Sequence, residues 1–343
     1  MFYRQILKKA WEITWENKTL WFFGFFALAL LGNNRAYNFV LNNLDLISRQ
    51  DLTAFYTFRL YERALTSFDG IINFFNSLGN LIINKPLSFF LSTLIFLAVT
   101  ALALALVWLM INSQICLISG IGRAKENKKI GFKDSFLLAR KYFWPILELN
   151  IIVQIIIYLL FIIFIYPAIA YSSFFSAITS ILFIFFFLIF IPLSIILAFL
   201  TIYASSFVIL RNQGLLKSIG SAWHLFYKNW IPSLEMGLIL FLIDIAAALG
   251  LIILIILLGI PFILLSVIFY FLASQAGLIF VAILMVICLI ALIIIFTAIL
   301  STFQYSAWTL LFFNLTEKKF AGRIVEIFSA LRSYLRKQAK KIK

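Results

Sequence analysis

Long apolar segments alternate with short polar connections along most of the chain. No charged residue occurs between Ile178 and Leu210, or between Ile245 and Leu315. An apolar helix of about 20 residues crosses the roughly 30 Å hydrocarbon core of a bilayer. The pattern therefore predicts an all-α fold, a polytopic transmembrane helical bundle whose six spans lie at about 19–32, 88–117, 146–167, 178–210, 232–258 and 278–313.

A basic, aromatic-rich stretch leads into an apolar span three times. Two copies match closely and read Trp144-Pro145-Ile146-Leu147-Glu148 and Trp230-Ile231-Pro232-Ser233-Leu234-Glu235. The first copy is looser and contains Lys8, Lys9, Trp11, Trp15, Lys18 and Trp21. Because tryptophan prefers the membrane–water interface, the recurrence indicates three hairpin repeats with interfacial amphipathic helices.

Each closely matched copy predicts an elbow between an interfacial helix and a spanning helix. The elbow residues are Trp144, Glu148, Trp230 and Glu235. A carboxylate at this depth can reach a preceding lysine, Lys141 or Lys228. We therefore expect these residues to lock the elbow and not to bind substrate.

The other segments complete a single transmembrane domain over residues 1–320. The outer loop 33–86 is expected to form a small amphipathic cap on the outer leaflet, with a partner or ligand lid as the alternative. Gly259 and Pro261 predict a helix break, so 261–277 is expected to be a re-entrant or interfacial segment. The first span is short, and a cleaved signal peptide is its competing interpretation.

The C-terminal segment 321–343 predicts a basic amphipathic tail helix on the cytoplasmic side. Its apolar residues share one face at 100° per residue. The opposite face carries Arg332, Arg336, Lys337, Lys340 and Lys341. This pattern is typical of a helix that lies in the headgroup layer, with its cations facing anionic lipids.

Composition supports the membrane class, and the charge distribution adds an orientation. Apolar residues make up 64% of the chain and charged residues 12%, whereas a soluble domain carries about 25% charge. The connections 1–18, 118–145, 211–231 and 314–343 hold 4, 7, 3 and 9 of the 28 Lys and Arg residues. The positive-inside rule then places both termini in the cytoplasm. The net charge of +15 favours anionic lipid headgroups over nucleic acid as the partner.

Polar groups inside the spans are the best candidates for chemistry. Asp244 lies near the middle of the fifth span, where an acid costs several kcal/mol unless it is protonated, paired or hydrated. A functional role and a helix-locking role are equally compatible with it. Asn150 and Gln154 share one face of the third span, and Gln304 lies in the sixth. These side chains either line a wet cavity or bond between helices, and we favour interhelical bonding.

Catalytic and metal-binding patterns are missing from the sequence. Cys116 and Cys288 lie in predicted spans and have no second cysteine or histidine at ligand spacing, and His224 is the only histidine. The sequence also contains no Gly-rich phosphate loop and no recognisable nucleophile arrangement. We therefore predict that the chain is not an enzyme and needs no metal or cofactor.

The late span ends in Gln304-Tyr305-Ser306-Ala307-Trp308-Thr309-Leu310-Leu311-Phe312-Phe313-Asn314-Leu315. With the repeated basic-aromatic elbow, this ending resembles the membrane domain of some bacterial glycerophosphoryl diester phosphodiesterases, and the related YciC-like uncharacterised inner-membrane families. The resemblance covers most of residues 1–320. It implies a stand-alone, multi-pass module of the bacterial cytoplasmic (inner) membrane. It does not imply the phosphodiesterase activity, which belongs to a separate soluble barrel.

Three functional hypotheses follow, and the last, an intramembrane enzyme, is the weakest because it needs two ionisable groups at one depth and the spans hold one deep acid, Asp244. The first is a non-catalytic membrane module that engages anionic lipids at the cytoplasmic face, or partner proteins, including further copies of the chain. The alternative is a transporter or channel for a small solute or lipid that uses Asp244 and the polar stripes on spans three and six.

Overall fold

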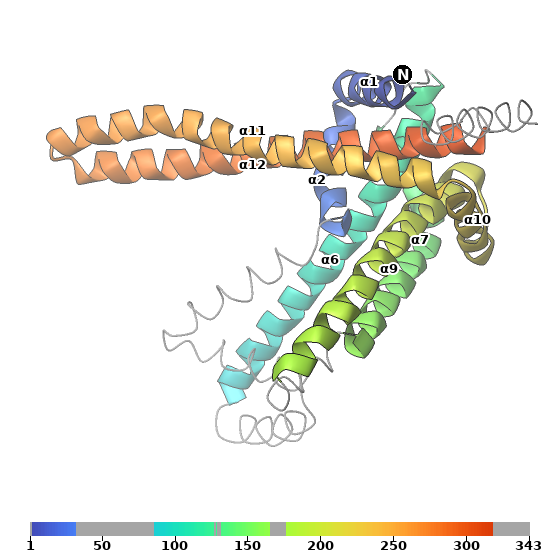
Figure 1. Cartoon of the computed structure of the whole chain (residues 1–343). Coiled ribbons are helices and arrows are strands. Elements are labelled where there is room, and N and C mark those ends of the chain that lie inside the picture. The colour runs from blue at the N-terminus through green and yellow to red at the C-terminus, as the bar shows by residue number, and fades with distance from the viewer. Residues whose placement is uncertain (1, 32–85, 127, 129–131, 165–175, 318–343) are drawn as a thin grey trace, which may run out of the picture. The chain divides into compact units, whose positions relative to one another are not determined.

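The computed structural model describes residues 2–31, 86–126, 128, 132–164 and 176–317. Within these residues it contains eight α-helices and no strand, which confirms the all-α prediction. The helices are α1 (Phe2–Glu16), α2 (Thr19–Leu31), α6 (Pro86–Lys125), α7 (Phe132–Phe164), α9 (Ser176–Arg211), α10 (Leu215–Lys228), α11 (Trp230–Phe271) and α12 (Gln275–Thr316) (Figure 1). The tail 321–343, with its five named basic residues, and almost all of the outer loop lie outside the described residues.

Five of these helices contain segments that are long and apolar enough to cross a membrane. The segments are Leu97–Lys125, Ser135–Leu160, Leu188–Arg211, Trp230–Phe271 and Gln275–Thr316. They overlap the second to sixth predicted spans. The first predicted span forms α2, whose 13 residues rise only about 20 Å. Helices of this length and composition are those of a membrane-embedded protein.

The chain divides into two compact units, one formed by residues 1–28 with 111–343 and the other by residues 29–110. In the second unit, the described part of α6 has exposed apolar side chains such as Leu97, Leu102 and Leu104. In the first unit, buried side chains concentrate in three segments: 111–121 of α6, 203–209 of α9 and 298–315 of α12. These three segments form the core of the first unit.

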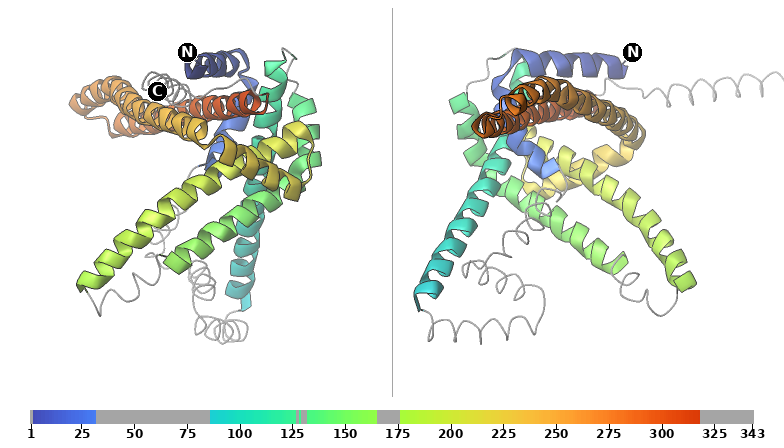
Figure 2. Two further views of the ribbon diagram at one scale, coloured as in Figure 1. Left: turned by 45° about the vertical axis from the view of Figure 1, so that its right-hand side comes forward. Right: turned by 90° about the vertical axis from the view of Figure 1, so that its left-hand side faces the viewer.

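Helix pairs in the first unit pack through aromatic side chains. α11 and α12 run side by side in every view (Figures 1 and 2), while α1 packs on α12, and both α7 and α10 pack on α9. The rings of Trp11 and Phe303 join α1 to α12 with centroids 6.0 Å apart. Phe207 and Phe312 join α9 to α12 at 4.8 Å. Phe303, Tyr305 and Phe312 of the late span therefore lie in the core.

The three basic-aromatic copies do not share one backbone geometry. Helix breaks separate α1 from α2 at Asn17 and α10 from α11 at Asn229. In both cases the asparagine amide donates to the carbonyl oxygen four residues earlier, at 3.0 Å, which satisfies an end group of the preceding helix. The second copy has Phe143 in place of asparagine, and α7 continues without interruption through Pro145. The elbow predicted at Trp144 and Glu148 is therefore wrong.

The predicted helix break at Gly259 and Pro261 is also wrong, because α11 continues through both residues to Phe271. Proline removes one backbone hydrogen bond, but unwinding the helix in an apolar environment would leave several groups unsatisfied. The chain reverses only at 272–274, where Ala273 has a φ of 49°. The Ser274 hydroxyl then accepts a hydrogen bond from the Gly277 amide at 3.2 Å. Residues 261–271 thus belong to α11, and 275–277 begin α12.

Candidate functional site

Basic connections gather at one end of the first unit. Lys125, at the end of α6, lies 2.6 Å from the carboxylate of Glu317, which directly follows α12. The Tyr142 hydroxyl of α7 donates to the amide oxygen of Asn212, just after α9, at 3.1 Å. These contacts join connections that are far apart in the sequence. We call this region the basic end; it carries Arg123, Lys125, Lys128, Arg140, Lys141, Arg211, Lys217 and Lys228.

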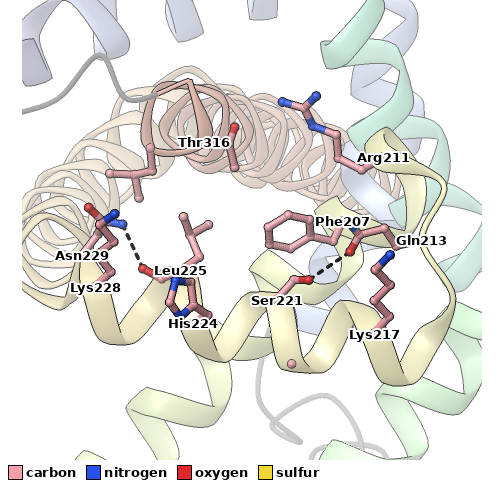
Figure 3. Close-up of a pocket in the computed structure, with 12 residues that line it drawn as sticks. Phe207, Arg211, Gln213, Lys217, Ser221, His224, Leu225, Lys228, Asn229 and Thr316 are labelled. Atoms are coloured by element: carbon pink, nitrogen blue, oxygen red, sulfur yellow. Dashed lines mark hydrogen bonds between the residues drawn. The ribbon is translucent and has the colours of Figure 1, made fainter.

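A pocket of about 910 Å³ lies at the basic end, between α9, α10 and α12 (Figure 3). Three buried apolar side chains, Phe207, Leu225 and Leu315, form part of its wall. The remaining lining residues are Arg211, Gln213, Lys217, Gly220, Ser221, His224, Lys228, Asn229 and Thr316. The lining therefore combines apolar, neutral polar and cationic groups and includes no carboxylate.

The cations lie at the two ends of this pocket. Figure 3 shows Arg211 and Lys217 at one end, and Lys228 at the other. Along α10, Lys217 and Lys228 are 11 residues apart, which corresponds to about 16 Å along the helix axis. Between them, the Ser221 hydroxyl donates to the Gln213 amide oxygen at 3.1 Å. Ser221, Gln213 and His224 thus lie between the two cationic ends.

Within the described residues, Arg211, Lys217 and Lys228 form no ion pair, so their positive charges are not neutralised by a neighbouring carboxylate. The acids on neighbouring elements are engaged elsewhere, Glu317 with Lys125 and Glu235 with the Tyr3 hydroxyl. Three uncompensated positive charges around one concave surface attract an anion. The pocket is therefore a candidate anion-binding site.

A second, neighbouring pocket of about 450 Å³ shares Arg211 but has a different charge balance. It contains the Lys125–Glu317 pair, and Lys125 also lies 3.9 Å from the centroid of the Phe313 ring. Glu126, also in its lining, accepts a hydrogen bond from Lys128 at 2.6 Å, which lowers the pKa of that carboxyl group. The carboxylates of Glu317 and Glu126 in the smaller pocket thus form ion pairs with lysines. The larger pocket, which has no carboxylate in its lining, is therefore the better candidate anion site.

The candidates inside the spans form two interhelical contacts. The Gln304 amide of α12 donates to the Asp244 carboxylate of α11 at 2.5 Å. The Asn150 amide of α7 donates to the Gln114 amide oxygen of α6 at 3.2 Å, and to the Ile146 carbonyl of its own helix. Gln154 is exposed. Two of the predicted polar residues, Asp244 and Gln304, are therefore partners, and only part of the predicted stripe on the third span bonds between helices.

The elbow glutamates do not make the expected contacts with lysine. Glu235 accepts a hydrogen bond from the Tyr3 hydroxyl of α1, which ties the N-terminal helix to the start of α11. Burial and this bond raise the pKa of Tyr3. The other elbow residues, Trp144, Glu148 and Trp230, are exposed. The elbow at the start of α11 is thus held by Tyr3 of α1.

The pocket could have been found from a helical pattern in the sequence. Lys217, Ser221, His224 and Lys228 follow one another at spacings of four, three and four residues, so they share one face of a helix. Arg211 and Thr316 carry no comparable signal, because they reach the pocket only through the packing of α9 and α12.

Among the described residues, no cluster of His, Cys, Asp or Glu could hold a metal ion. No protein-family model, no curated protein and no solved structure matches the chain.

Proposed function

We propose that the protein is a non-catalytic membrane module that binds anionic lipid headgroups at its basic end. The observation that carries this proposal is the pocket between α9, α10 and α12, which presents Arg211, Lys217 and Lys228 without a carboxylate. Phosphate groups of anionic lipids lie at the same depth as basic residues that flank membrane spans. A pocket of this charge at the end of two apolar helices, α9 and α12, is therefore suited to a lipid headgroup.

The proposed topology places six spans in three hairpin repeats in a bacterial cytoplasmic (inner) membrane. The basic end then faces the cytoplasm with both termini, in agreement with the positive-inside rule. α1 and α10 serve as interfacial amphipathic helices: both have a buried face, formed by Ile6, Ala10 and Ile13 in α1 and by Ala222 and Leu225 in α10. The resemblance to stand-alone inner-membrane families supports the same arrangement.

The test is extraction of the full-length protein into native-lipid nanodiscs, followed by mass spectrometry of the co-isolated lipids and proteins. We expect anionic lipids to be enriched over the bulk membrane, and the enrichment to fall at high salt because exposed charges are screened. An unrelated multi-span protein extracted from the same membrane is the control. A lipid composition equal to that of the control would contradict the proposal, and a stoichiometric protein partner would assign the basic end to that partner.

Transport through Asp244 is the second candidate function, because a half-buried acid in an apolar helix is a functional candidate by default. The bond from Gln304 satisfies one carboxylate oxygen and links α11 to α12, which favours a structural role. Asp244→Asn separates the two roles. Loss of solute flux at unchanged thermal stability would support transport, whereas unchanged flux would leave the structural role.

A further inference from the structure

We infer that the pocket between α9, α10 and α12 binds a phospholipid with two phosphate groups, of the diphosphatidylglycerol type. This inference rests on the proposed function and names the lipid class that the pocket selects. It follows from three properties of the site: the separation of its cations, the absence of a carboxylate from its lining, and its partly apolar wall.

The separation of the cations distinguishes one phosphate from two. Arg211 and Lys217 lie at one end of the pocket, and Lys228 lies at the other (Figure 3). The backbone positions of Lys217 and Lys228 are about 16 Å apart along the axis of α10, and their side chains leave the helix at the two ends of the pocket. Because a charge-assisted hydrogen bond spans only about 2.8 Å, two phosphates joined by a short glycerol bridge can contact more of these cations at once than a single phosphate can.

Each end offers a suitable set of donors. The Arg211 guanidinium can bind two phosphate oxygens at once, and Lys217 adds a second positive charge to the lining. At the other end, Lys228 lies next to Asn229, whose amide is held by the Leu225 carbonyl at 3.0 Å. Two monoanionic phosphates meet three cations, so the pocket keeps no excess negative charge when it is filled.

The wall of the pocket favours a lipid over a soluble phosphate ester. Leu225 and Leu315 are buried apolar residues that line the pocket together with Phe207. The glycerol carbons and the first acyl carbons of a lipid can contact the edges of these side chains that face the pocket, whereas a soluble diphosphate offers no such contact.

The experiment titrates the full-length protein, held in phosphatidylcholine nanodiscs, with diphosphatidylglycerol or phosphatidylglycerol at equal phosphate. Binding is followed by native mass spectrometry and by the melting temperature. Because each charge-assisted contact strengthens binding by about tenfold, diphosphatidylglycerol should bind about tenfold more tightly than phosphatidylglycerol. The preference should weaken with salt.

Variants test whether the preference comes from this pocket. Lys228→Gln removes the only cation of one end, and Arg211→Gln removes one of the two cations of the other end; both residues are exposed. Lys228→Gln should reduce the affinity for diphosphatidylglycerol to about that for phosphatidylglycerol, and Arg211→Gln should reduce it less, because Lys217 remains. Lys9→Gln is the matched control, because it removes one charge from an exposed site on α1 and should leave the preference unchanged. The melting temperature in phosphatidylcholine alone checks that the variants fold.

The outcomes separate this inference from the proposed function. Equal binding of both anionic lipids per phosphate, or equal effects of Lys228→Gln and Lys9→Gln, would overturn the two-phosphate site and leave the binding of anionic lipids intact. Stabilisation by soluble glycerol 3-phosphate to the same extent as by the lipid would overturn the lipid assignment. No binding of either anionic lipid above phosphatidylcholine would overturn both.

Discussion

Replacing Gly24 by alanine should loosen the contact between α2 and α12. A Cβ atom at Gly24 would lie 2.3 Å from the Thr302 hydroxyl oxygen and 2.6 Å from the Ala298 carbonyl oxygen. The Thr302 hydroxyl donates to that carbonyl at 2.7 Å and lies 3.2 Å from the Leu20 carbonyl oxygen. Rotating Thr302 away would therefore remove one clash, break a hydrogen bond and leave the backbone clash in place.

The magnitude follows from the backbone clash. An ordinary contact begins at 3.4 Å, and the Ala298 carbonyl would lie 2.6 Å from the new atom, so α2 must move by about 0.8 Å or more. Overpacking of this kind costs about 1–3 kcal/mol. The higher helix propensity of alanine offsets up to about 1 kcal/mol of that cost. We therefore expect Gly24→Ala to lower the free energy of unfolding by about 1–2 kcal/mol.

The assay is thermal unfolding of the purified protein in one detergent, followed by tryptophan fluorescence. Gly250→Ala is the matched control, because it makes the same substitution within α11 and a Cβ atom there would meet nothing within 4 Å. Gly250→Ala should melt at or slightly above the wild-type temperature, and Gly24→Ala several degrees below it. A Gly24→Ala variant that melts together with the control would refute the close packing of α2 on α12.

Two further substitutions test interhelical bonds through thermal unfolding. Asp244→Ala removes the acceptor of the Gln304 amide and should cost about 1–3 kcal/mol, whereas Asp244→Asn keeps an acceptor and should melt close to wild type; equal melting of the two variants would contradict the bond. Tyr3→Phe should change the pH dependence, because burial and the bond to Glu235 raise the pKa of Tyr3 in the folded state. The contribution of Tyr3 to the free energy of unfolding is constant below about pH 10, where tyrosine is neutral in the folded and the unfolded state. This contribution is lost at higher pH, because Tyr3 then ionises only in the unfolded state. Wild type should therefore lose more stability than Tyr3→Phe between about pH 10 and 11, and parallel curves would contradict the raised pKa.

The positions of the helices were largely predictable from the sequence. A long apolar segment in a membrane must satisfy its backbone hydrogen bonds internally, and a helix does so. The fourth span was expected at 178–210, and α9 covers Ser176–Arg211. Helix ends were harder to predict, since they depend on single residues. Asn17 and Asn229 end helices through their side-chain amides, while α7, which has Phe143 at the corresponding place, continues through Pro145.

Contacts between the helices were not predictable from the apolar pattern. α11 and α12 are apolar on all faces, so periodicity does not indicate which face meets a neighbour. The sequence also does not show which polar residues bond to each other. Asp244 and Gln304 each stand out in an apolar segment, but they are 60 residues apart, and only the fold shows that they form a hydrogen bond. The same holds for Tyr3 and Glu235, which are 232 residues apart.

The lengths of α11 and α12 constrain how this hairpin enters a bilayer. Each has 42 residues and rises about 63 Å, twice the hydrocarbon thickness of about 30 Å. Even a tilt of about 40°, at the upper end of the observed range, leaves a depth of about 48 Å. Exposing the excess to water would cost about 1.5–3 kcal/mol for each large apolar side chain.

The hairpin must therefore stay in contact with lipid or with another apolar surface along its whole length. Pro261 is the place where α11 bends at least cost, since its ring already removes the hydrogen bond to the Leu257 carbonyl. A bend there would turn residues 261–277 toward the membrane plane without unwinding the helix. Helical continuity and membrane placement are thus separate properties: the predicted break at Pro261 is wrong, while an interfacial position for 261–277 stays a prediction that the length of α11 favours.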